Sequence, residues 1–136
     1  MQAATQTVQM TSKKRIVAGR VLSGIAILFL VLDGIGKLVK PPAVVEGTKS
    51  LGYPESTILG IGITLLVCTI AYAIPRTSIL GAILLTGYLG GAVATHVRVG
   101  NPLFTHVLFP IYLGVFIWAG LYWRETKVRA LIPFRG

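Results

Sequence analysis

The sequence has little of what a water-soluble enzyme requires. Only 12% of its 136 residues are charged, 54% are hydrophobic, and the mean hydropathy is +0.77. Acidic residues are the scarcest, because four Asp and Glu stand against 13 Lys and Arg, giving a formal net charge of +9. A composition this apolar lies outside the range of soluble domains of similar length. It excludes an ordinary soluble enzyme.

Cysteine is nearly absent as well. Cys68 is the single cysteine of the chain, which excludes an intramolecular disulfide framework, a cysteine-based zinc site and the CxxC pair of membrane dithiol oxidoreductases. Cys68 lies in the middle of an apolar run without a nearby charge, where a packing role is expected. Redox chemistry in this chain would therefore need a cofactor or a partner protein.

Long apolar runs dominate the chain instead. An α-helix needs about 20 apolar residues to cross the ~30 Å hydrocarbon layer of a membrane. Four runs have this length, at about 17–38, 56–74, 78–97 and 103–123. The sequence thus predicts an all-α fold, a four-helix transmembrane bundle forming a single integral membrane domain over residues 1–136. The first run is too long for a signal peptide and lacks a cleavage site, so we expect it to be retained.

The basic residues predict the orientation of the bundle. Four spans place both tails and the middle turn on one side, and most Lys and Arg residues fall there. Cytoplasmic segments of membrane proteins carry this excess, and Trp118, Tyr122 and Trp123 fit an aromatic belt on the same side. We therefore expect cytoplasmic termini, a multi-pass location in a bacterial-type inner membrane, and membrane lipids as partners. The excess of basic residues thus follows from the membrane topology, and we do not expect nucleic acid as a partner.

Prolines and glycines give finer expectations. Asn101–Pro102 predicts the N-cap and first residue of the fourth helix, and Pro110 within that span predicts a bend. The segment after Pro41–Pro42 has its apolar residues on one helical face, which predicts a short interfacial helix on the outer membrane surface that caps the bundle. The GxxxG spacing from Gly87 to Gly91 predicts close packing within the bundle, and a homodimer stays open as the alternative.

Ionisable residues within the spans gather at the end opposite the tails. Asp33 and Lys37 lie near the outer end of the first span, and His96 and Arg98 lie at the outer end of the third. His106 lies just inside the start of the fourth span, so the two histidines are expected at similar depth. Intramembrane charges are costly and mark functional sites. These five residues are the predicted ligand-binding site, an outward-facing polar mouth.

Several chemistries stay open for this mouth. Structural alternatives are an i,i+4 ion pair between Asp33 and Lys37 and a head-group anchor at Arg98. Two neighbouring helix ends suit a bis-histidine haem poorly, and a zinc or copper site that adds Asp33 or Glu46 to the histidines has no recognised spacing motif. Hydrogen bonding to a polar head group, with an apolar tail among the helices, fits best. Tyr88 would extend the polar track inward.

Four segments carry a family resemblance: Leu32–Leu38 (LDGIGKL), Gly52–Pro54 (GYP), Gly87–Arg98 (GYLGGAVATHVR) and Asn101–Phe104 (NPLF). They resemble the DoxX-like family of small four-helix membrane proteins, over residues 19–124 approximately. The resemblance implies a four-helix transmembrane bundle and an association with quinone chemistry and membrane oxidoreductase assemblies. It places its polar matches at Asp33, Lys37, His96 and Arg98.

Three functions follow as hypotheses. The leading one is binding of a quinone-type or lipid-like ligand at the mouth for an oxidoreductase partner, with a bound quinone as the candidate cofactor. Asp33 and Lys37 would shape and neutralise the site, while His96, Arg98 and His106 would hydrogen-bond the head group. The second is a small proton-coupled transporter using Asp33, which lies away from the midplane position usual for transport sites. The third is a non-catalytic scaffold subunit. No metal site is predicted, and whether any reaction is catalysed stays open.

Overall fold

The computed structural model describes residues 2–131, with side chains from Lys13 onward. Its helices are α1 (Gln2–Val39), α2 (Pro42–Ser50), α3 (Ile58–Ala73), α4 (Ser78–Arg98), α5 (Phe109–Arg124) and α6 (Thr126–Leu131). Short turns precede three of them, namely η1 (Glu55–Thr57), η2 (Pro75–Thr77) and the π-helical turn η3 (Leu103–Val107). Four helical segments are long and apolar enough to cross a membrane, Lys13–Val39, Glu55–Ala73, Pro75–Arg98 and Leu103–Arg124. These segments confirm the four predicted spans.

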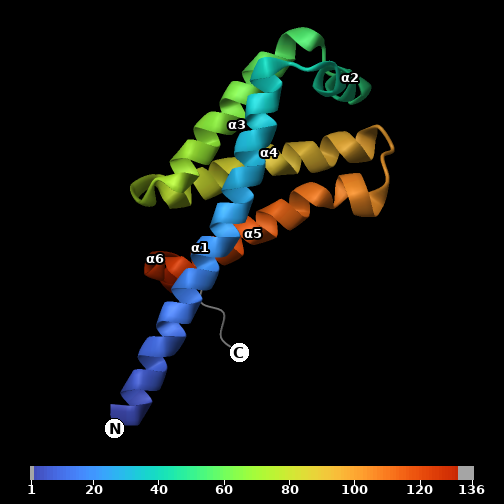
Figure 1. The fold of residues 1–136 in the computed structure, drawn as a ribbon. Coiled ribbons are helices and arrows are strands. Elements are labelled where there is room, and N and C mark those ends of the chain that lie inside the picture. Colours follow the sequence, from blue (N-terminus) through green and yellow to red (C-terminus); the bar gives the residue numbers. More distant parts are fainter. Residues whose placement is uncertain (1, 132–136) are drawn as a thin grey trace.

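The four long helices form a bundle with two unlike ends (Figure 1). α1 packs against α3 and α5, and α4 packs against the same two helices, which closes a ring of contacts. We call the end where α1 and α4 finish the mouth end, and the end where α3 and α5 finish the tail end. Toward the mouth end the α1–α3 pair diverges from the α4–α5 pair, and α2 lies at the opening between them (Figure 1).

The fourth span begins differently from the expectation. Asn101 does not cap a helix, and the α-helical part of the span begins only at Phe109, after the π-helical turn η3. Pro110 therefore lies in the first turn of α5 instead of bending the middle of a helix. Proline has no N–H group and its ring clashes with the carbonyl of residue i−4, so a regular α-helix starts at such a residue more readily than it passes through it.

The helices approach one another most closely at glycines, but not at the GxxxG pair Gly87 and Gly91. A side chain at Gly81 of α4 would overlap the backbone of Tyr72 in α3, and a Cβ atom at Gly19 of α1 would lie 2.7 Å from the carbonyl oxygen of Gly120 in α5. Small residues at such crossings let two backbones come into contact. These are the tight contacts that hold the bundle together.

The GxxxG prediction was wrong about where the close packing occurs. Gly87 and Gly91 are exposed, and a Cβ atom at either position would have no neighbour within 4 Å. The i,i+4 spacing shows that the two glycines share a face of α4, but it does not show what that face contacts. The face that packs inward is instead set by Ala82, Leu85 and Leu89, which are buried.

A buried polar cluster joins the helices at the tail end. The hydroxyl group of Tyr72 donates a hydrogen bond to the Ile117 carbonyl oxygen (2.7 Å) and lies 2.8 Å from Ser23 Oγ. Arg124 Nε donates to the same Ser23 Oγ (3.0 Å), and its Nη2 lies 3.4 Å from Ser78 Oγ. The guanidinium carbon lies 5.2 Å from the centroid of the Tyr72 ring. This Tyr72 cluster connects α1, α3, α4 and α5.

Substitution of Gly81 tests the helix contacts. Gly81→Val should lower the thermal unfolding midpoint strongly, because overpacking costs about 1–3 kcal/mol or more. Gly87→Val is the matched control in the same helix and should leave the midpoint nearly unchanged. Fluorescence-detected size-exclusion chromatography after heating measures both. Equal losses in the two variants would contradict this assignment of the packing face.

Removal of a single hydroxyl group tests the Tyr72 cluster. Tyr72→Phe should destabilise the bundle by about 1–2 kcal/mol, since it removes a hydrogen-bonded group and leaves buried partners unsatisfied. Tyr112→Phe, at an exposed tyrosine of α5, is the control and should be neutral. The free energy of unfolding in mixed detergent micelles is the quantity to compare. An unchanged free energy of unfolding in Tyr72→Phe would contradict a stabilising role for the Tyr72 cluster.

Candidate functional site

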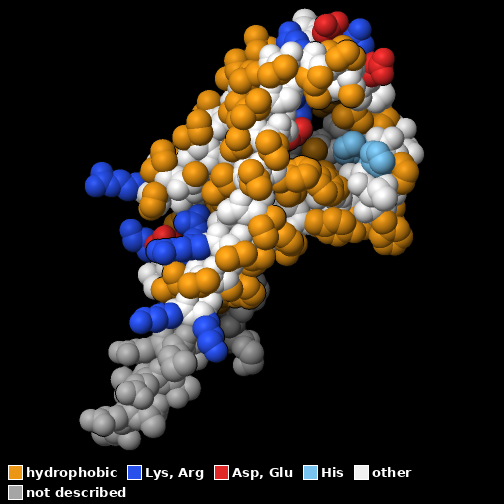
Figure 2. Space-filling model, viewed as in Figure 1, with side chains coloured by type: hydrophobic (Ala, Val, Ile, Leu, Met, Phe, Trp, Pro, Cys, Tyr) orange, Lys and Arg blue, Asp and Glu red, His pale blue; other side chains and the backbone are white. Residues whose placement is uncertain are grey.

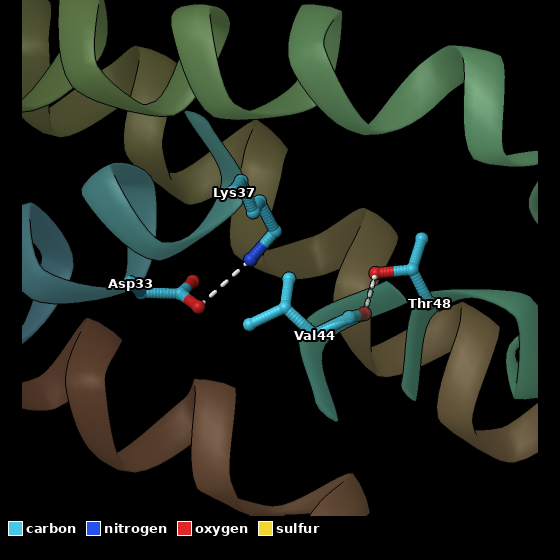
Figure 3. Close-up of polar contacts among 4 residues, drawn as sticks. All are labelled: Asp33, Lys37, Val44 and Thr48. Atoms are coloured by element: carbon cyan, nitrogen blue, oxygen red, sulfur yellow. Dashed lines mark hydrogen bonds and ion pairs between the residues drawn. The ribbon is translucent and has the colours of Figure 1, made fainter. Parts of the chain in front are cut away.

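One wall of the mouth is an ion pair on α1. Lys37 Nζ donates a hydrogen bond to a carboxylate oxygen of Asp33 at 2.7 Å, one helical turn away. The Lys37 side chain is only 15% exposed, whereas the Asp33 side chain is 43% exposed. The carboxylate is therefore the more accessible partner. Figure 3 shows the two side chains pointing toward one another, with Val44 of α2 beside them. The i,i+4 pair expected from the sequence is confirmed.

The position of Lys37 follows from a close helix contact. A Cβ atom at Gly62 of α3 would lie 2.8 Å from Lys37 Cβ and 3.2 Å from the Gly34 carbonyl oxygen. The absence of a side chain at Gly62 lets α1 lie against α3 at this point. The aliphatic part of Lys37 is buried in the contact, and its ammonium group extends to Asp33.

The second wall is a pair of histidines. His96 lies in the last turn of α4 and His106 lies in η3. Their ring centroids are 5.7 Å apart and the ring planes are inclined by 70°, which confirms the predicted similar depth. Asn101 Nδ2 donates to His96 Nδ1 (2.7 Å), and Thr105 Oγ1 lies 2.8 Å from His106 Nδ1. The Nε2 atoms of both rings have no hydrogen-bond partner among the described residues.

Arg98 connects the first loop to the end of α4. Its Nη2 donates a hydrogen bond to the Leu51 carbonyl oxygen (3.0 Å). The next residue, Gly52, has a φ of +90°, and a Cβ atom there would lie 2.9 Å from the same Nη2. Glycine fits both the backbone conformation and the close approach. The Tyr53 hydroxyl group adds a second link, 3.0 Å from Thr95 Oγ1.

α2 is an amphipathic helix whose apolar face packs toward the bundle. Thr48 is buried and Val44 is half-buried, and a Cβ atom at Gly36 of α1 would lie 3.7 Å from a Val44 methyl group. The predicted short helix is therefore present. Glu46 is exposed and takes part in no hydrogen bond or ion pair within the described part of the chain. The structure does not bring it to the ion pair or the histidines.

A hollow lies between the two walls. Figure 2 shows it beneath the first loop, with an acidic side chain at one side and the histidine side chains at the other. Tyr88 of α4 is half-buried and packs against the hydrophobic core. We use the name mouth for this hollow with its two walls, Asp33 and Lys37 on one and His96 and His106 on the other.

The structure also assigns roles that the sequence did not indicate. Asn101, expected to cap a helix, instead contacts His96. Trp118, expected only in an aromatic belt, donates from Nε1 to Thr86 Oγ1 at 2.7 Å and so links α5 to α4. Arg124, at the end of α5, belongs to the Tyr72 cluster. Among the described residues, no three His, Cys, Asp or Glu side chains gather closely enough to hold a metal ion.

Comparison with known proteins gives one match. A family model described as the DoxX-like family matches residues 21–120, which include both walls of the mouth and Asn101. Neither the curated proteins nor the solved structures contain a match.

Substitution of Arg98 tests the link between the first loop and α4. Arg98→Ala should make the backbone amides of residues 42–54 exchange with deuterium about tenfold faster, since one hydrogen bond to a charged donor is lost. Lys49→Ala is the control, because it removes only the exposed 3.4 Å ion pair with Glu55. Hydrogen–deuterium exchange mass spectrometry compares the variants. Unchanged exchange in Arg98→Ala would show that the loop is held by other contacts.

Proposed function

This chain belongs to the DoxX-like family, and from that premise we propose that its mouth binds the polar head of a quinone-type or similar lipid-like ligand. The protein would hold this ligand for a membrane oxidoreductase assembly. It is a multi-pass membrane protein by its four apolar helices. We further propose that it lies in the inner membrane with its mouth facing outward, because the tail end carries most of the basic residues.

The observation that carries this proposal is the pairing of two polar walls across one hollow. Each histidine has its Nδ1 atom engaged by a neighbour, so both rings are held in place, while no described residue bonds to their Nε2 atoms. Opposite them, the more exposed carboxylate of Asp33 is balanced by Lys37. A few fixed polar groups in an otherwise apolar surrounding are typical of sites for small amphipathic ligands.

The residues of the site would have different roles in binding the head group. His96 and His106 would hydrogen-bond the head group through Nε2, and Arg98 would contribute N–H groups that Leu51 does not use. The Asp33–Lys37 pair would keep the opposite wall polar and close to neutral. A quinone ring could enter this space without bringing a charge of its own, which suits a site where uncompensated charge is costly.

The divergence of the helix pairs would accommodate the ligand tail. Apolar side chains are exposed along α1 and η3 near the mouth, including Leu32, Leu38 and Phe104. A lipid-like tail lying against them would leave the membrane only at its polar head. The chain itself carries no disulfide pair, so electrons would pass to or from the bound ligand through a partner subunit.

The test is co-purification of the ligand with matched variants. The protein is solubilised gently, analysed by native mass spectrometry, and extracted for quinones. His96→Ala and His106→Ala should each lower bound quinone up to about tenfold, the effect of losing one hydrogen bond to the head group. Lys49→Ala, which removes only the exposed ion pair with Glu55, should retain it, and thermal unfolding should be similar in all variants.

Two results would contradict the proposal. Quinone that stays bound in both histidine variants would place the ligand elsewhere on the bundle. A wild-type protein that carries no small molecule but a stoichiometric protein partner would instead support a scaffold subunit.

A further inference from the structure

Asn101 is bound to His96 at two points. Its backbone N–H group donates to the His96 carbonyl oxygen at 3.0 Å, and its side-chain Nδ2 donates to His96 Nδ1 at 2.7 Å. The amide nitrogen of asparagine is only a donor. With the amide in this orientation the ring nitrogen that it contacts accepts, which places the proton of a neutral His96 ring on Nε2.

The end of α4 explains why Asn101 lies there. Val99 is the C-cap residue of α4, and Gly100 follows it with a φ of +74°. The N–H group of Gly100 donates to the Val97 carbonyl oxygen, and that of Asn101 donates to the His96 carbonyl oxygen. This pair of bonds defines a Schellman motif, which folds the chain back over the last helical turn. The fold of the turn thus delivers the Asn101 amide to the His96 ring.

We infer that Asn101 is a positioning residue that fixes His96 as an Nε2–H donor toward the mouth, and that the site thereby selects a head group with a carbonyl acceptor. This inference rests on the proposed function, and it restricts the proposed ligand to one whose head group carries a carbonyl oxygen. A quinone presents carbonyl oxygens, which only accept hydrogen bonds, whereas the reduced quinol presents hydroxyl groups that also donate. A quinol oxygen can also accept from Nε2–H, but the proton of its hydroxyl group then needs a further acceptor, so the oxidised form is the better match to this donor. A membrane ester carbonyl shares the same acceptor chemistry.

The first experiment reads the tautomer without any ligand. The chain has two histidines, so a His106→Gln variant with ¹⁵N-labelled histidine and no histidine tag reports His96 alone by NMR. We expect a single Nε2–H tautomer with Nδ1 unprotonated. In the double variant with Asn101→Asp, the carboxylate can only accept, so the signal should move to a ring protonated at Nδ1. If Asn101 only stabilised the turn, its substitution would not move the His96 proton from Nε2 to Nδ1 in the NMR spectrum.

The second experiment measures ligand preference in the full-length protein with both histidines. A short-chain ubiquinone analogue, its quinol and a diacylglycerol are titrated into nanodiscs containing the wild type or Asn101→Asp. The wild type should bind the quinone about tenfold more tightly than the quinol, and Asn101→Asp should lose this preference. Tighter binding of the diacylglycerol than of the quinone would assign the acceptor to a lipid ester.

The outcomes separate this inference from the proposed function. A wild type that binds the quinone but has His96 protonated at Nδ1, or an Asn101→Asp variant with an unchanged NMR signal, would overturn the role of Asn101 alone. A wild type with the expected tautomer that binds neither quinone nor quinol would overturn the proposed quinone ligand alone. Thr105→Val in the His106→Gln background, which leaves Asn101 and His96 in place, is the control and should leave the His96 signal unchanged.

Discussion

The hydroxyl group of Tyr72 is the contact on which the rest of the bundle depends. It donates to the Ile117 carbonyl oxygen and lies against Ser23, to which Arg124 also donates. Within a membrane, helices gain no hydrophobic free energy by leaving lipid for one another, so packing of small residues and hydrogen bonds must hold them together. Both occur at the tail end, where the Gly19–Gly120 and Gly81–Tyr72 contacts flank the Tyr72 cluster.

A bundle that is closed at one end can open at the other. The two helix pairs diverge toward the mouth end, and α2 covers the space between them (Figure 1). Arg98 and Tyr53 hold this cover to α4, while the ion pair on α1 and the two histidines line the space beneath. The candidate site residues thus lie toward the end at which the two helix pairs diverge (Figure 1). This arrangement would place a polar site at the edge of the membrane, as the proposed function requires.

The sequence predicts those features that depend on neighbours along the chain. Hydropathy and length were sufficient for the four spans, and the short connection between the last two spans was sufficient to place His96 and His106 at one depth. The i,i+4 spacing likewise predicted the Asp33–Lys37 pair. Each of these follows from helical geometry alone.

Features that depend on helix rotation or on distant residues were not predictable. Gly87 and Gly91 share a face of α4, but only the packed bundle determines that this face is exposed. Ser23 and Arg124 are 101 positions apart in the sequence, and no local pattern links them. Asn101 has a residue type that favours a helix N-cap, yet the Schellman motif before it brings its amide to His96 instead.

Photoaffinity mapping of the bound quinone would test the central claim most directly. A short-tailed azidoquinone is cross-linked to the protein in native-lipid nanodiscs, with excess unlabelled quinone as competitor, and the labelled peptides are sequenced. We expect competed labelling around Asp33, at the end of α4 and in η3, and none at the tail end. Labelling that is centred on the Tyr72 cluster, or that the competitor does not reduce, would contradict a ligand site at the mouth.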